Sequence, residues 1–323
     1  MEKWLVTGGG GFLGSNAGLF LHSRTESLGL VRPESVAGSV FVTTVEADLF
    51  DVTRAVEVVK AVSPTVILHC AAVSRHEDCE SDPARAELIN VTATRELARA
   101  AHAIGARFIY VSTDAVFDGA TGVYDEDAVP NPFSVYGQTK LEGEHVALLE
   151  ADALVVRTNF FGWSPSGRSS ILEFFYNALT RGDVVKGYTD FVVTSMYAQQ
   201  LVEAIWTLAE RDARGIFHVA SKDPLSKYDF AIAAADVFEL DASLVFPTSE
   251  GIEPRDWAKS RDISLDTSKF ESFTQTPAPT QRQGLTAARS DASTVRVWLQ
   301  AGRMPDTADA STASREPSES DWF

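Results

Sequence analysis

The sequence has few cysteines and lacks long apolar segments. Only two of its 323 residues are cysteine, Cys70 and Cys79, and they form neither a CxxC pair nor part of a histidine cluster. A zinc site is therefore not indicated, and we expect no metal. No apolar run approaches the roughly 18 residues of a membrane-spanning helix. The first strand-like stretch begins at Lys3, which leaves no room for a signal peptide. These features predict a cytoplasmic protein without membrane association.

Basic residues are also scarce relative to acidic ones. The chain has 28 Lys and Arg against 45 Asp and Glu, so its formal net charge is −17. This balance disfavours binding to nucleic acid or to an anionic membrane surface. It does not exclude a single anionic ligand, because backbone amides can form a local phosphate site. The 45% hydrophobic content is typical of a globular protein with one large α/β domain or two smaller ones.

The first 160 residues alternate between short apolar runs and stretches with helical spacing of apolar residues. The predicted strands are Lys3–Thr7, Leu28–Val31, Val40–Val45, Thr65–His69 and Arg107–Ser112, and the clearest helices are 51–62, 83–104 and 133–150. Continuously apolar strands separated by helices favour a parallel sheet that is covered on both faces. The sequence therefore predicts a doubly wound α/β (Rossmann) domain over residues 1–160.

The pattern is less regular after residue 160. Helices are predicted after Ser195 and Ser226, with a strand at 216–220 between them. We expect residues 161–273 to form a smaller, mixed substrate-binding region that returns strands and helices to the Rossmann domain. From residue 274 the composition shifts to Thr, Ala, Ser, Pro and Arg, with one apolar island at 295–299. This composition predicts a low-complexity, partly disordered tail over 274–323 without a clear final helix.

A glycine-rich turn follows the first strand. Gly8, Gly11 and Gly14 form a G-x-x-G-x-x-G pattern between that strand and an amphipathic helix. Gly8 permits a tight turn, Gly11 lets the backbone approach a pyrophosphate, and Gly14 allows close packing of the helix. The backbone amides near Phe12 and Leu13 would then face the anion. In this strand–turn–helix context the pattern predicts a dinucleotide site.

Three residues after the second and third strands bear on the choice of cofactor. NAD-binding folds often carry an acid after the second strand, but this chain has Arg32 there. An arginine suits a 2′-phosphate, so NADP(H) is preferred and NAD(H) remains possible; alternatively, Arg32 is a solvated loop residue. Asp48, followed by Leu49, is a candidate to contact the adenine amino group.

Tyr136 and Lys140 share one face of the predicted helix 133–150. A phenol with its ordinary pKa of about 10 is a poor acid–base catalyst near neutral pH. A cationic lysine one turn away favours the phenolate and can also hold a nicotinamide ribose. The fifth strand ends at Ser112-Thr113-Asp114, where a hydroxyl could polarise a substrate carbonyl. A purely structural role for these three residues, as a turn or a cap, is the alternative.

Four motifs occur in a characteristic order: TGGGGFLG (7–14), HCAA (69–72), VSTDAVFDG (111–119) and YGQTK (136–140). Together they resemble an extended short-chain dehydrogenase/reductase. The segment ESDP (80–83), Asn90 and the spacing from Tyr124 to Lys140 resemble the dTDP-4-dehydrorhamnose reductase (sugar-nucleotide reductase) family. The resemblance covers about residues 1–270. It weakens near the end, because the usual Arg-Pro is replaced by Lys259-Ser260-Arg261.

The resemblance implies roles for individual residues. Thr113 would be the catalytic hydroxyl, Tyr136 the proton donor and Lys140 its partner. Ala71 and Ala72 match the segment beside the cofactor. Asn90, placed with the cofactor site, matches the helix asparagine that steadies it. Candidates for substrate contact are Ser74, Asp114, Phe117, Asn159 and Arg168.

The implied function is NAD(P)H-dependent reduction of a 4-keto nucleotide-activated deoxysugar, by a protein that could be a homodimer. Related 4,6-dehydratases have Thr-Asp-Glu at the end of the fifth strand, whereas this chain has Thr113-Asp114-Ala115. The missing carboxylate favours ketone reduction over elimination. Two alternatives stay open. One is an epimerase or dehydratase of the same superfamily. The other is a non-catalytic NADP-binding subunit like the regulatory subunit of methionine adenosyltransferase.

Overall fold

A seven-stranded parallel sheet forms the centre of the molecule. The computed structural model describes residues 2–32, 40–41, 43–249 and 261–301. The strand order is β11-β6-β5-β4-β1-β2-β3, and every pair is parallel. The strands are β1 (Lys3–Thr7), β2 (Glu26–Val31), β3 (Thr43–Glu46), β4 (Val66–His69), β5 (Arg107–Val111), β6 (Leu154–Arg157) and β11 (Gly215–His218). This confirms the predicted doubly wound Rossmann architecture.

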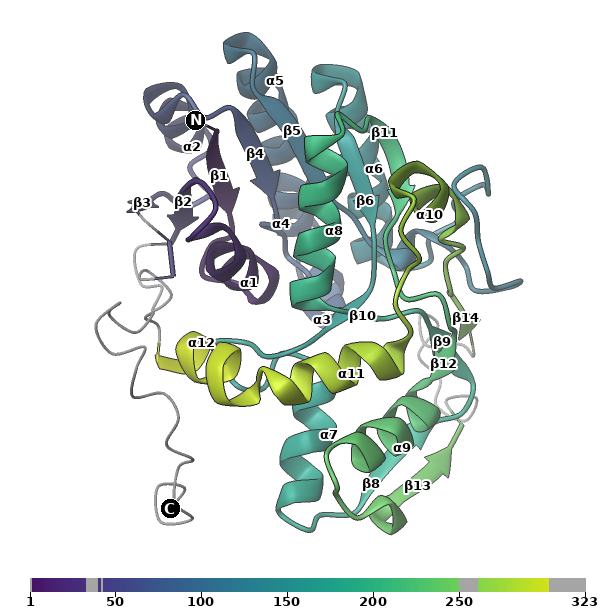
Figure 1. The fold of residues 1–323 in the computed structure, drawn as a ribbon. Coiled ribbons are helices and arrows are strands. Elements are labelled where there is room, and N and C mark those ends of the chain that lie inside the picture. Colours follow the sequence, from purple (N-terminus) through teal and green to yellow (C-terminus); the bar gives the residue numbers. More distant parts are fainter. Residues whose placement is uncertain (1, 33–39, 42, 250–260, 302–323) are drawn as a thin grey trace.

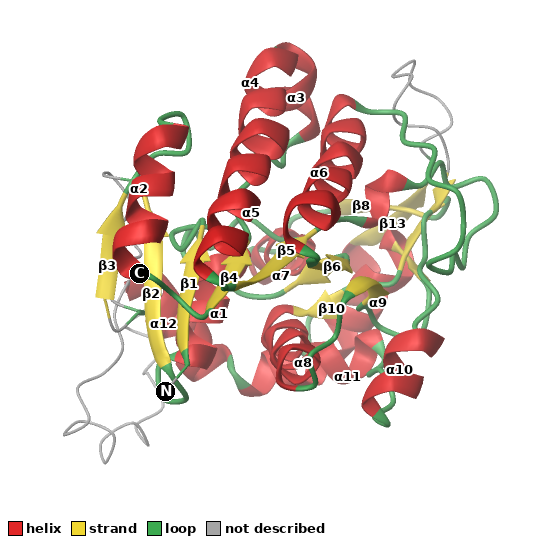
Figure 2. Cartoon of the chain, turned by 90° about the horizontal axis from the view of Figure 1, so that it is seen from above, coloured by secondary structure: helices red, strands yellow, loops and turns green. Residues whose placement is uncertain are grey.

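Helices cover both faces of this sheet (Figures 1 and 2). One face carries α2 (Val52–Val62), α5 (Ala93–Ile104) and α6 (Val135–Ala151); the other carries α1 (Phe12–Leu21) and α8 (Ala198–Glu210). Alternate side chains of one strand enter different cores. In β1, Trp4 and Val6 belong to the core under α1 and α8, while Leu5 belongs to the core under α2 and α5. This division explains why the strands are apolar throughout.

Two predicted elements differ from the structure. The third strand was expected at Val40–Val45, but β3 begins only at Thr43. The expectation was wrong because Val40 and Phe41 are buried for another reason: the Phe41 ring fills the space left by Gly18 and Gly29. The helix expected over 83–104 is divided into α4 (Pro83–Glu87), a π-helical turn (Leu88–Thr92) and α5. A short helix, α3 (His76–Ser81), precedes it.

The second half of the chain adds short sheets beyond the carboxyl ends of the strands (Figure 1). Three small sheets pair β7 with β10, β12 and β14 with β9, and β13 with β8. Their strands are β7 (Phe160–Phe161), β8 (Val185–Tyr188), β9 (Phe191–Val193), β10 (Met196–Tyr197), β12 (Leu225–Ser226), β13 (Val245–Thr248) and β14 (Arg261–Asp262). The helices of this part are α7 (Ile171–Thr180), α9 (Lys227–Val237) and α10 (Ser268–Thr274). Strand β11 returns to the main sheet beside β6.

The C-terminal part of the described chain is helical. Helix α11 (Gln281–Ser290), a π-helical turn (Ala292–Arg296) and α12 (Val297–Ala301) lie where the composition predicted no clear helix. The low apolar content was misleading because a few well-placed apolar residues suffice to dock these helices: Leu285, Val295 and Leu299 are buried. Residues 302–323 lie outside the described residues. Among the described helices, none has both the length and the apolar character needed to cross a membrane.

Candidate active site

The glycine turn joins β1 to α1 and leaves no room for a side chain at Gly8 or Gly14. Gly8 has a φ of +67°, and a Cβ on it would lie 2.9 Å from the Cα of Ala71. A Cβ on Gly14 would lie 2.2 Å from the Gly8 carbonyl oxygen. The Gly11 amide donates to that same carbonyl at 2.8 Å. The turn therefore holds the start of α1 against the loop that follows β4.

Helix α1 begins at this turn without a side-chain cap at Gly11. The N–H groups in the first turn of a helix have no intrahelical partners, so those near Phe12 and Leu13 can bind an anion. Leu13 is buried in the core, so its side chain serves packing. The Phe12 ring lies 5.0 Å from that of Phe160. Backbone amides at the carboxyl edge of β1 are thus available to an anion, and the pyrophosphate site stays a prediction.

The candidate residues for the adenosine end follow neighbouring strands. Arg32 is exposed directly after β2, and Asp48 lies two residues after β3. Because β2 and β3 are parallel neighbours, both residues lie at the same edge of the sheet. The Asp48 carboxylate accepts from the Phe50 amide at 3.0 Å, and Leu49 is buried.

Thr113, Tyr136 and Lys140 lie together where β5 ends beside α6. The Thr113 hydroxyl donates to Asp114 Oδ1 at 3.1 Å and accepts from the Ala115 amide at 3.1 Å. Burial raises the pKa of Tyr136 above its ordinary value, and the nearby Thr113 hydroxyl partly opposes this. The neutral phenol is therefore the form held at neutral pH.

The Lys140 amine is turned toward the backbone of β5. Its Nζ donates to the Val111 carbonyl at 2.6 Å and lies 4.0 Å from the centre of the Tyr110 ring. Burial lowers the pKa of Lys140 to about 7, and the charge of Glu144 acts in the opposite direction. Burial is the largest influence on the pKa of the Tyr136 phenol. The role of Lys140 as the partner of Tyr136 stays a prediction.

Asp114 is a buried carboxyl group next to this trio. Burial raises its pKa to about 7, although the hydrogen bonds from Asn159 and Thr113 lower it. Asn159 Nδ2 donates to Asp114 Oδ2 at 2.8 Å, and the Ser195 hydroxyl donates to Asn159 Oδ1. Two of the expected substrate residues, Asp114 and Asn159, therefore bind each other at the end of β5.

The sequence model of the RmlD substrate binding domain matches residues 2–293. The chain belongs to this family. It is 33% identical to methionine adenosyltransferase 2 subunit beta of Xenopus tropicalis over 235 residues, which cover 69% of each chain. It is 32% identical to the probable low-salt glycan biosynthesis reductase Agl14 of Haloferax volcanii over 247 residues, 75% of this chain and 82% of that protein.

A solved structure extends this likeness to the fold. The hypothetical dTDP-4-dehydrorhamnose reductase from Sulfolobus tokodaii has a TM-score of 0.77 and 29% identity, covering 87% of this chain and 98% of its own. The chain is thus an RmlD-family member of the extended short-chain dehydrogenase/reductase type. Its relatives include both a reductase and a subunit of another enzyme.

In this RmlD-family chain, Asn90 lies in the π-helical turn and is buried. Its Oδ1 accepts from the Val73 amide at 2.8 Å, and its Nδ2 donates to Thr139 Oγ1 at 3.0 Å. The side chain thereby ties the loop after β4 to the residue that precedes Lys140. The polar atoms of the Asn90 side chain are thus bonded to protein groups, and its role in steadying the active site stays a prediction.

His69 was given no role by the sequence, yet it organises the loop beside the glycine turn. Its Nδ1 lies 2.6 Å from Thr7 Oγ1, and its Nε2 lies 3.0 Å from Thr94 Oγ1. Thr7 Oγ1 also accepts from the Ala71 amide at 3.3 Å. Burial lowers the pKa of His69 to about 3, so the ring is neutral and bridges the two hydroxyls. A histidine closing an apolar strand was the available signal.

The remaining expected residues are spread out. Ser74 is exposed in the loop after β4, and Ala72 beside it is half-buried. Phe117 is 2% exposed and stacks on Tyr124 at 4.2 Å, so its side chain is core and does not line an open surface. Arg168 is exposed on the loop before α7.

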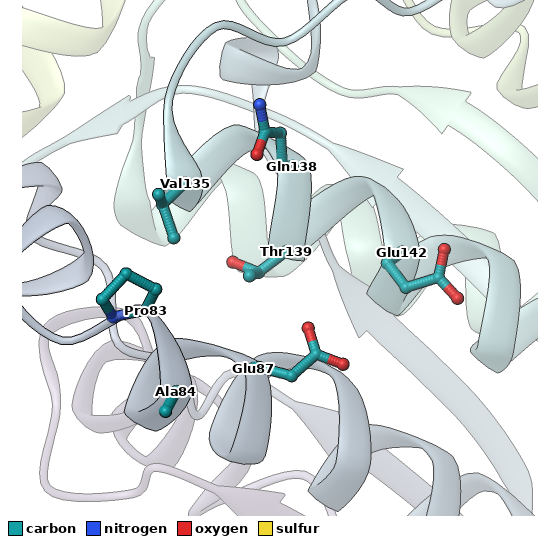
Figure 3. A pocket seen from close by; sticks show the side chains of 7 residues that line it. All are labelled: Pro83, Ala84, Glu87, Val135, Gln138, Thr139 and Glu142. Atoms are coloured by element: carbon teal, nitrogen blue, oxygen red, sulfur yellow. The ribbon is translucent and has the colours of Figure 1, made fainter.

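A hollow of about 520 Å³ lies between α4 and α6 and is separate from the site (Figure 3). Its lining includes Glu87, Gln138 and Glu142, whose side chains come from the two helices. Thr113, Tyr136 and Lys140 are not among its lining residues.

Proposed function

We propose that this chain reduces the 4-keto group of a nucleotide-activated deoxysugar with NAD(P)H. The observation that carries the proposal is the placement of Thr113 and Tyr136, which act on each other, at the same carboxyl edge of the sheet as the glycine turn. Carboxyl ends of parallel strands are where doubly wound folds bind ligands. A ketone reductase needs one proton donor near a dinucleotide site, and this arrangement supplies one.

A nicotinamide dinucleotide fits the residues that are present. A side chain at Gly8 or Gly14 would fill the turn, and glycine keeps the backbone open to a pyrophosphate. When bound, the cofactor supplies the hydride. The exposed Arg32 supports a preference for NADP(H) over NAD(H), with Asp48 and Leu49 at the adenine end.

The chain's own residues then handle the proton. Thr113 holds the carbonyl oxygen of the substrate, and Tyr136 donates its proton to that oxygen as negative charge develops on it. The raised pKa of Tyr136 suits reduction of a ketone, because the phenol stays protonated until the developing alkoxide takes up the proton. Lys140 grips the ribose of the cofactor. Ser74, Asp114, Asn159 and Arg168 contact the nucleotide sugar.

A second candidate function is regulatory binding of NADP without turnover. It is favoured by one observation, the 33% identity to a methionine adenosyltransferase subunit over 69% of the chain. The catalytic trio alone does not distinguish the two, since a binding protein can retain it.

The deciding experiment follows the absorbance of NADPH and NADH with freshly prepared dTDP-4-dehydrorhamnose. Wild-type protein should oxidise NADPH. Tyr136→Phe should lose activity by at least about 100-fold, the typical contribution of a general acid, while still binding NADPH. If wild type binds NADPH but consumes none with this or other 4-keto sugars, the regulatory function replaces the reductase.

A further inference from the structure

We propose that the buried pair Glu144–Arg157 is a positioning unit of the active site, which keeps Lys140 charged and fixes the end of β5 against α6. The inference rests on the proposed reductase function. It assigns a task to two residues to which the sequence motifs give none.

The pair is buried and doubly hydrogen-bonded. Glu144 and Arg157 are 1% and 2% exposed. Arg157 Nε lies 3.0 Å from Oε1, and its Nη2 lies 2.7 Å from Oε2 of Glu144. The Ser112 hydroxyl donates to the same Oε1 at 2.5 Å. One carboxylate therefore joins the middle of α6 to the ends of β5 and β6.

Glu144 and Arg157 are each connected to a residue of the candidate active site through the same helix, a sequence neighbour or a hydrogen bond. Glu144 follows Lys140 by four residues, so both share one face of α6. Ser112 directly precedes Thr113. Arg157 leads into Thr158, whose carbonyl accepts from the Asp114 amide at 3.2 Å. A shift of the carboxylate would thus displace α6 and the end of β5, which carry the candidate catalytic residues, together with the end of β6.

The carboxylate also faces a lysine that burial tends to neutralise. Burial lowers the pKa of Lys140 to about 7, and the negative charge of Glu144 raises it. Four titratable groups around the amine are uncharged near neutral pH, because burial lowers the pKa of His69 and raises those of Cys70, Tyr110 and Tyr136. Of the two groups that raise the pKa of Lys140, Glu144 and Cys70, Glu144 is thus the one that is anionic at neutral pH.

Stability alone does not account for this pair. Buried ion pairs are often no more stabilising than apolar side chains of similar volume. Arg157 Nη1 is buried without a hydrogen-bond partner among the described residues. A charged donor that is buried and left unpaired in this way is destabilising. A pair kept at that cost is consistent with an electrostatic task at the neighbouring lysine.

The test compares Glu144→Gln with the double variant Glu144→Gln/Arg157→Gln. The double variant removes both charges but leaves side chains that can hydrogen-bond, so it keeps the test valid if the single variant does not fold. Glu142→Gln is the matched control, because it removes a charge from an exposed position of the same helix. The titration of Lys140 is read by NMR on isotope-labelled lysine, with Lys140→Arg identifying its signal.

Loss of Glu144 should lower the pKa of Lys140 by about one unit or more, as expected when an opposite charge is removed. The alkaline limb of kcat should then move to lower pH in both Glu144 variants and stay in place in Glu142→Gln. Asp114 also titrates near neutral pH, so the lysine signal, and not the rate profile, decides.

An unchanged Lys140 titration, or a wild-type kcat in the double variant, would overturn the proposal. Absence of turnover in the wild type would instead contradict the reductase function. The lysine titration remains measurable in that case, so the two failures are distinguishable.

Discussion

Asp114 has a carboxyl group whose proton is retained by burial. Its pKa is raised to about 7, so the folded protein binds this proton over a range in which the unfolded chain has lost it. A group with a raised folded-state pKa stabilises the fold at low pH and loses that contribution as pH rises through the folded value. The free energy of unfolding should therefore fall as pH rises from about 4 to about 7, and the loss due to Asp114 should be complete above that range.

Asp114→Asn should remove this penalty, because the amide is neutral at every pH. Between about pH 5.5 and 8.5 the variant should gain about 2 kcal/mol in unfolding free energy relative to wild type, at 1.4 kcal/mol per pKa unit. Urea denaturation at both pH values measures it. Asp127→Asn, an exposed control, should give no pH-dependent difference. Parallel stability curves for Asp114→Asn and wild type would show that Asp114 is ionised in the fold.

At the residue scale, the sequence predicted the residues whose spacing is local. Tyr136 and Lys140 are one helical turn apart, and Thr113 ends a recognisable strand. It missed His69 and Arg157, whose partners are reached through the fold: the His69–Thr7 contact spans 62 positions. Long-range polar pairs of this kind leave no periodic signal in a single sequence.

At the scale of elements, two glycines of the β1–turn–α1 unit are needed for different reasons. A Cβ on Gly14 would lie 2.2 Å from the Gly8 carbonyl oxygen, whereas a Cβ on Gly11 would have that oxygen at 3.1 Å as its nearest neighbour. Gly11 also has an extended backbone conformation that any residue adopts. Gly14 is therefore required by packing, and Gly11 only by the approach of a ligand.

Gly14→Ala should lower the stability of the cofactor-free protein by about 1–3 kcal/mol, as overpacking does, and should abolish NADPH binding. Gly11→Ala should unfold close to the wild-type temperature but bind NADPH at least about tenfold more weakly, the equivalent of 1.4 kcal/mol. Thermal unfolding without cofactor and NADPH fluorescence titration measure the two effects. Wild-type affinity in Gly11→Ala would show that the pyrophosphate does not approach this residue.

Strands β4 and β3 show which elements the hydrophobic pattern can predict and which it cannot. The strand β4 was predicted within one residue, because its apolar run coincides with its pairing. The third strand was misplaced because Phe41 is apolar without being paired: its ring fills space beside Gly29. Such a contact depends on a glycine in another strand, and hydrophobic periodicity carries no information about it.

At the scale of the whole molecule, the C-terminal helices are part of the fold. The Trp163 indole N–H donates to the Ala288 carbonyl at 2.8 Å, which ties α11 to the segment after β7. That segment is in turn connected to helix α1, because Asn16 Nδ2 donates to the Trp163 carbonyl at 2.9 Å. Residues near both ends of the described chain are thus linked through one tryptophan.

Leu285→Ala and Leu299→Ala test this organisation, since both side chains are buried in the main core. Each should destabilise the whole protein by about 2–5 kcal/mol, the usual cost of such a cavity. Val297→Ala is the control within α12, because this side chain is 44% exposed and should change stability by less than about 0.5 kcal/mol. Denaturation followed by tryptophan fluorescence measures all three. If Leu299→Ala unfolds with the wild-type midpoint while Leu285→Ala does not, the molecule's cooperative fold ends at α11 and α12 contributes nothing to it.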